Sequence, residues 1–123
     1  INIEALTMID MASKDILPSV IKYTTELAAS INEVVSAGAD ASVQKETLDE
    51  ITVYLKEAKT ALTTLKADQA EAEKGCVKCT AEFYRDVIKA DMAALRTPVD
   101  ILETLVDSEY WPMPTYGELL FEA

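Results

Sequence analysis

Apolar residues recur along this chain at alternating steps of three and four positions. A step of three or four returns to the same face of an α-helix, so a regular run of such steps marks one buried face. In the first third this apolar seam predicts one helix over about residues 2–37. It keeps its phase across Pro18, so we predict a bend there rather than a break. The seam consists of Leu6, Ile9, Ile16, Val20, Tyr23, Leu27 and Val34, with Ser13 and Ser30 completing the spacing.

Two further seams predict helices over about residues 41–74 and 77–108. The polar positions between their members are mostly Lys, Glu, Thr and Asp, which is typical of a solvated face. The members of the second seam are Leu48, Ile51, Leu55, Ala58, Leu62, Leu65 and Ala72. The members of the third are Tyr84, Ile88, Met92, Leu95, Val99, Leu102 and Val106.

Glycine and proline mark the expected helix ends. Gly38 is expected to end the first helix, and either Asp40 or Ser42 can accept the first free N–H groups of the second. Lys74 and Gly75 form a plausible end of the second helix. Pro98 leaves two alternatives in the third helix: a bent but continuous helix, which the unbroken seam favours, or a break with Thr97 as cap and Pro98 as the first helical residue.

The predicted fold is all-α, an elongated antiparallel three-helix bundle that runs up, down and up over residues 1–109. Three helices of about 30 residues each rise about 45 Å, and short connections force neighbouring helices to be antiparallel. The seams are narrow, as in coiled coils, and apolar residues such as Ile31 and Val35 lie beside them. We therefore expect surface that a monomer does not cover, and self-association.

Residues 110–123 break the helical pattern. Pro112 and Pro114 each lack an N–H and clash with a preceding helical turn, which predicts an extended tail ending in a short helical turn. Aromatic rings are expected to anchor this tail, and a pocket role for Trp111 and Tyr116 is less favoured. A stiff strand suits bridging, so we slightly favour docking on another domain or subunit over packing on the chain's own helices. The structural or interaction candidates are Trp111, Pro112, Pro114, Tyr116, Leu120 and Phe121.

Composition and net charge limit the classes of partner that the chain can bind. The chain has 123 residues, a net charge of −11 and a pI near 4.3. A polyanion would be repelled, so nucleic acid and anionic membrane surfaces are poor partners. No apolar run approaches the ~20 residues of a membrane span, and no signal-peptide pattern opens the chain. Ile1 is not an initiator residue and lies within a helical pattern, so we expect a fragment of a longer protein.

Candidate chemistry is sparse. The chain has no histidine, which excludes a His general base, a Ser-His-Asp triad and a His-containing zinc site built from this chain alone. Cys76 and Cys79 form a C-x-x-C motif without the second pair that zinc needs and without a thioredoxin-like βαβ pattern. We interpret them as reduced cysteines at a helix start. The acidic residues, Asp68 and Asp86 among them, alternate with lysine and lack EF-hand spacing, so we interpret them as a solvated face. We expect no catalytic, cofactor-binding or metal-binding residue.

Four parts of the chain stand out in order: residues 2–12 with 15–18, 83–88, 102–106 and 110–121. Together they resemble the C-terminal region of type III glutamine synthetases, a bacterial class. The first part resembles the helix that enters this region, and the last resembles the extreme C-terminus of that family. Residues 36–79 match no motif of the family.

The resemblance implies a non-catalytic helical C-terminal domain whose role is structural, with the catalytic strands upstream. The parent enzyme would join ammonia to glutamate using ATP and magnesium ions, in a cytoplasmic assembly of stacked rings. The implied partners are its own catalytic domain or neighbouring subunits of a homo-oligomer. No position matches the family's ATP-, metal- or glutamate-binding parts. The alternative is an autonomous helical module whose exposed seam captures a partner helix.

Overall fold

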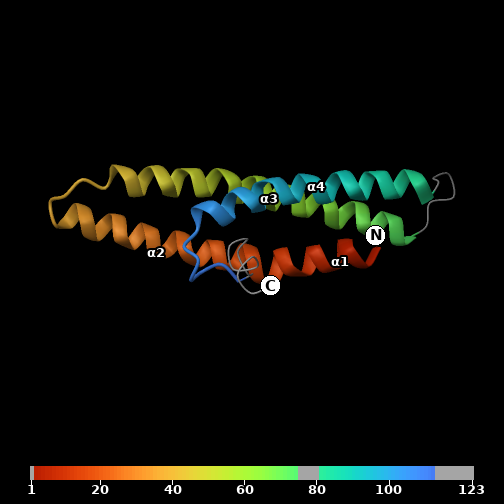
Figure 1. The fold of residues 1–123 in the computed structure, drawn as a ribbon, viewed down its shortest axis with the longest axis horizontal. Helices are drawn as coiled ribbons and strands as arrows, with labels where there is room; N and C mark the ends of the chain where they lie inside the picture. Colours follow the sequence, from red (N-terminus) through yellow and green to blue (C-terminus); the bar gives the residue numbers. More distant parts are fainter. Residues whose placement is uncertain (1, 75–80, 113–123) are drawn as a thin grey trace, which may run out of the picture.

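The computed structural model describes residues 2–74 and 81–112, and within these residues the only regular structure is helical. The elements are α1 (Asn2–Met11), a π-helical turn η1 (Ala12–Ile16), α2 (Leu17–Ser36), α3 (Ser42–Lys74) and α4 (Ala81–Leu105). α1 and α2 form one long rod, α3 returns beside it, and α4 runs back along α3 (Figure 1). The prediction of an elongated up-down-up helical bundle is confirmed.

The first rod crosses Pro18 without a break, but it does not keep its phase. Proline supplies no N–H and crowds the preceding turn, and here the helix widens into the π-turn, in which the Leu17 N–H donates to the Ala12 carbonyl. This turn contains one residue more than an α-helical turn. Ala5 upstream of the turn and Ala12 at its first residue are therefore the fully buried positions, whereas Leu6 is 43% exposed. The predicted seam is wrong at Leu6, while Ile9 is half-buried and packs against the core.

The connection between α2 and α3 is a compact turn at Gly38. The Ala39 N–H donates to the Val34 carbonyl (3.1 Å) and the Gly38 N–H to the Val35 carbonyl (2.9 Å), which satisfies carbonyl groups at the helix end. Gly38 has φ +84°, a conformation that side chains disfavour. Asp40, rather than Ser42, accepts the first N–H of α3, since the Ser42 N–H donates to Asp40 Oδ1 at 3.1 Å.

α4 runs unbroken through Pro98, so the continuous alternative is the correct one. The Thr97 hydroxyl donates to the Ala93 carbonyl (3.1 Å), one turn back within the same helix, and does not cap a new one. Pro98 itself is buried. Cys76 and Cys79 lie outside the described residues.

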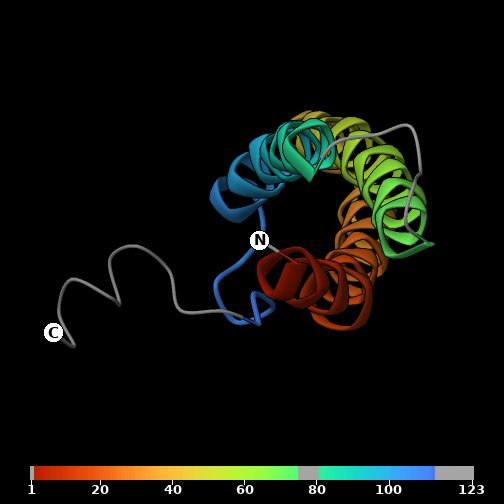
Figure 2. The ribbon, with the colours of Figure 1, turned by 90° about the vertical axis from the view of Figure 1, so that its right-hand side faces the viewer.

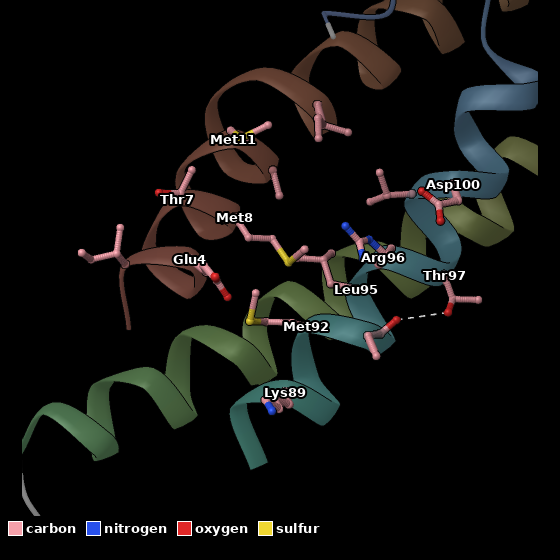
Figure 3. Close-up of a pocket in the computed structure, with 15 residues that line it drawn as sticks. Glu4, Thr7, Met8, Met11, Lys89, Met92, Leu95, Arg96, Thr97 and Asp100 are labelled. Atoms are coloured by element: carbon pink, nitrogen blue, oxygen red, sulfur yellow. Dashed lines mark hydrogen bonds between the residues drawn. The ribbon is translucent and has the colours of Figure 1, made fainter. Parts of the chain in front are cut away.

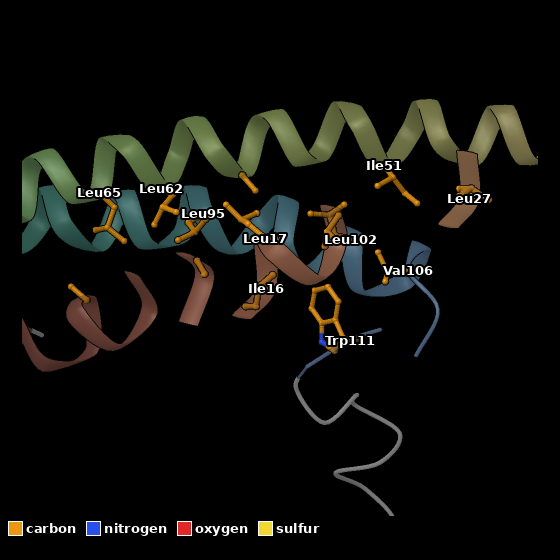
Figure 4. Close-up of a cluster of buried hydrophobic side chains, with 14 of the residues drawn as sticks. Ile16, Leu17, Leu27, Ile51, Leu62, Leu65, Leu95, Leu102, Val106 and Trp111 are labelled. Atoms are coloured by element: carbon orange, nitrogen blue, oxygen red, sulfur yellow. The ribbon is translucent and has the colours of Figure 1, made fainter. Parts of the chain in front are cut away.

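The core follows the second and third seams. α3 packs most extensively on α4, and α2 packs on α3. α1 makes fewer contacts with α3 and with α4. Burying a Leu or Ile side chain contributes roughly 1.5–3 kcal/mol, so this α3–α4 interface dominates the packing energy. Among the largest fully buried side chains are Ile51, Leu62, Leu65, Leu95 and Leu102 (Figure 4). Val20 is fully buried as well.

Candidate interaction site

The segment after α4 turns the chain back onto the bundle. The Tyr110 N–H donates to the Asp107 carbonyl (2.9 Å), and the Trp111 N–H donates to the Ser108 carbonyl (3.3 Å). The Glu109 N–H donates to Asp107 Oδ1 at 3.0 Å, which fixes the start of this turn. The turn therefore directs the side chains of Tyr110 and Trp111 back toward the helical bundle.

Trp111 packs into the chain's own core. Its side chain is 8% exposed and belongs to the same buried cluster as Ile16 and Leu102 (Figure 4). Next to it, the Tyr110 ring lies 5.2 Å from the Tyr23 ring, centroid to centroid. Burial raises the pKa of the Tyr110 hydroxyl, and the nearby charge of Glu26 adds to the effect.

Within this chain Trp111 is buried against its own helices. The sequence-based preference for docking of the tail on another domain or subunit stays a prediction. Pro112, the next residue, is exposed. The other tail candidates, Pro114, Tyr116, Leu120 and Phe121, lie outside the described residues, and an interaction role for them stays a prediction.

A groove of ≈ 860 Å³ lies between α1 and α4. Its apolar lining includes Met8, Met11 and Met92, which are three of the four methionines of the chain (Figure 3). Charged side chains line its edges, with Glu4 on α1 and Lys89, Arg96 and Asp100 on α4. The seams did not reveal this groove, because it depends on the shifted phase of α1 and on how far α1 stands from α4.

A second, smaller groove of ≈ 660 Å³ lies between α3 and α4. Asp91 lines it together with Thr60, Thr64 and Pro98. Asp91 Oδ2 is buried and has no hydrogen-bond partner among the described residues. Burial, followed by the carboxyl of Asp68 on α3, raises the pKa of Asp91 to about 6. A proton shared between the two carboxyls would give Oδ2 a partner and relieve their repulsion.

The sequence predicted acidic residues such as Asp68 and Asp86 to be solvated. Asp86 is exposed, but Asp68 and Asp91 are half-buried where α3 meets α4. Within residues 2–74 and 81–112, no group of three or more Cys, Asp or Glu side chains is placed to hold a metal ion. In the same part of the chain, no helix has the length and hydrophobicity of a membrane span.

Comparison with known proteins finds similarity to glutamine synthetases. Residues 1–35 match the model of the glutamine synthetase C-terminal domain. A glutamine synthetase from Butyrivibrio fibrisolvens is 34% identical over 98% of this chain and 18% of its own length. One from Bacteroides fragilis (strain YCH46) is 26% identical over the same shares. No solved structure gives a significant match. The chain thus spans about a fifth of the length of these relatives.

Proposed function

The chain is related to the glutamine synthetases, and we propose that it serves as a non-catalytic C-terminal helical domain of a type III enzyme of this family. The observation that carries the proposal is the coverage: 98% of the chain aligns with 18% of each relative. The remaining four-fifths of each relative leaves room for a catalytic domain outside the aligned part. The type III assignment rests on the resemblance of both ends of the chain to that class.

The proposed parent is a ligase that makes glutamine from glutamate, ammonia and ATP with magnesium ions. In this proposal the parent is a cytoplasmic homo-oligomer, and the bundle packs against its own catalytic domain or a neighbouring subunit. The bundle has a core of its own, built from all three long helical segments. A domain with its own core can pack as a unit against another part of an enzyme.

The test is an assay of the purified 123-residue chain with glutamate, ammonia, ATP and magnesium. We expect no glutamine formation under conditions in which the Butyrivibrio enzyme turns over. Measurable turnover by the chain alone would contradict a non-catalytic role.

The alternative is an autonomous helical module that binds a partner helix, and the α1–α4 groove is the observation in its favour. The gene around the coding sequence separates the two proposals. A glutamine synthetase core encoded upstream in the same frame supports the first, and its absence supports the second.

A further inference from the structure

The π-turn η1 sets which face of α1 lies against the bundle. A π-turn holds one residue more than an α-helical turn, so closing it into a regular turn would rotate α1 by about 100°. In the structure Ala5 and Ala12 take two inward positions and are 0% and 1% exposed. With a regular turn these positions would pass to the residues that follow them, Leu6 and Ser13.

Each register of α1 presents a face that can pack on the bundle. In the regular register Leu6 would lie inward in phase with the apolar seam, and Ile9, which is half-buried in the structure, would turn further inward. Ser13 would lie inward too, but its hydroxyl donates to the Ile9 carbonyl one turn back, so burial would leave its proton paired. The regular register therefore buries larger apolar side chains. The observed register places Ala5 and Ala12 inward, which lets α1 approach the bundle closely.

Pro18 tips the balance toward the π-turn. In a regular helix the Lys14 carbonyl would face the ring of Pro18, which has no N–H to donate and would crowd that carbonyl. The π-turn avoids this contact, because the Leu17 N–H donates to the Ala12 carbonyl instead. The observed register thus depends on one local contact at Pro18.

Little else in the bundle holds the rotation of α1. Viewed along the bundle, α1 and α4 border its open side (Figure 2), and α1 contacts α4 less than it contacts α3. At the other end of the π-turn, Ile16 belongs to the same buried cluster as Trp111 and is held there. A change of register would therefore be confined to the part of the chain upstream of Ile16.

We propose that α1 exchanges between these two registers, with η1 as the hinge. In the regular register Leu6 takes the position of Ala5, and its larger side chain moves α1 away from α3. Met8 and Met11 rotate with α1, so the α1–α4 groove that they line is formed in the observed register alone. A molecule that fills this groove would stabilise the register with the π-turn. This inference does not rest on the proposed function.

Thiol labelling with N-ethylmaleimide tests the exchange in the 123-residue chain, with C76S/C79S as the background. The A5C thiol is buried in the observed register and should react at least about tenfold faster than global unfolding allows, because the exchange exposes it. P18A removes the contact that favours the π-turn. It should speed labelling of A5C at least about tenfold and slow labelling of L6C about twofold or more. The matched control P98A changes the proline inside α4 and should leave both rates unchanged.

Deletion of Asp15 separates the change of register from other openings of α1. Asp15 is exposed in η1, and its removal takes away the extra residue, so a regular turn then keeps Ala5 and Ala12 inward. The A5C thiol should then react only at the rate that global unfolding allows. The control D15A keeps the chain length and should label as fast as the A5C background. Circular dichroism checks that each variant is folded.

Three outcomes would overturn the proposal. The A5C thiol could react no faster than global unfolding allows, or the deletion of Asp15 could label as fast as D15A. P18A could also speed labelling of both A5C and L6C, which would indicate fraying of α1 instead of a rotation. If the deletion variant does not fold, the opposite responses of A5C and L6C to P18A still decide between rotation and fraying.

Discussion

Trp111 acts in this structure as a core residue of the bundle. Replacing it with alanine removes the indole ring from the cluster that includes Ile16 and Leu102. We expect Trp111→Ala to lower the free energy of unfolding of the isolated chain by about 3 kcal/mol or more. Urea unfolding measures this, with Pro112→Ala at the exposed neighbouring position as the control, expected to change stability by less than about 0.5 kcal/mol. Equal midpoints for the wild type and Trp111→Ala would show that the ring is not buried in the isolated chain.

Asp91 gives the chain a pH-dependent stability. Its pKa in the folded chain is about 6, above the ordinary value of 3.8, so the folded state holds an extra proton between these values. The contribution of Asp91 to stability therefore falls as the pH rises from about 4 to about 6, and the loss is complete above that range. Asp91→Asn should remove this loss and stabilise the chain at pH 7 by on the order of 1 kcal/mol, since solvent screens a half-buried group.

The measurement is the difference in unfolding free energy between Asp91→Asn and the wild type across this pH range, which cancels the titration of other carboxyls. The difference should grow with pH. Asp68→Asn should act in the same direction because it removes the same repulsion, whereas Asp86→Asn, at an exposed site on α4, should not. A pH-independent difference for Asp91→Asn would exclude the raised pKa.

At the scale of elements, the turn between α2 and α3 depends on the backbone conformation of Gly38. A Cβ added to Gly38 would meet no atom within 4 Å. Gly38→Ala should therefore destabilise the chain by about 1 kcal/mol through backbone strain alone. Gly38→Asn should lose less stability than Gly38→Ala, because asparagine tolerates a positive φ better than alanine does. Urea unfolding compares the variants, and an alanine variant as stable as the wild type would refute this account of the turn.

The whole molecule should not be equally stable throughout. α3 and α4 share the most extensive interface, whereas α1 contacts the rest of the bundle sparsely. Helices with few tertiary contacts open more often, so backbone amides in α1 should exchange with deuterium earlier than those around Leu62 and Leu65. Hydrogen exchange followed by mass spectrometry of a dilute, monomeric sample measures this order. Simultaneous exchange of α1 and the middle of α3 would indicate a single cooperative unit instead.

The sequence by itself determined the helices, the antiparallel order and the turn at Gly38, because these depend on interactions within one or two helical turns. The second and third seams identified core residues such as Leu62 and Leu102 for the same reason. The phase of α1 depended on how the backbone accommodates Pro18, and one extra residue rotates the upstream face by about 100°. Only the tertiary structure could decide that Leu6 faces outward and Ala5 inward.

Tertiary structure also decided where Trp111 packs, where the α1–α4 groove lies and that Asp68 lies near Asp91. Each of these joins residues that are far apart in the chain, and their distance is set by the rotation and spacing of whole helices. The periodicity of one segment does not contain that information. The residues that line the α1–α4 groove are therefore visible in the sequence as residue types, such as three methionines and two basic residues, but not as a site.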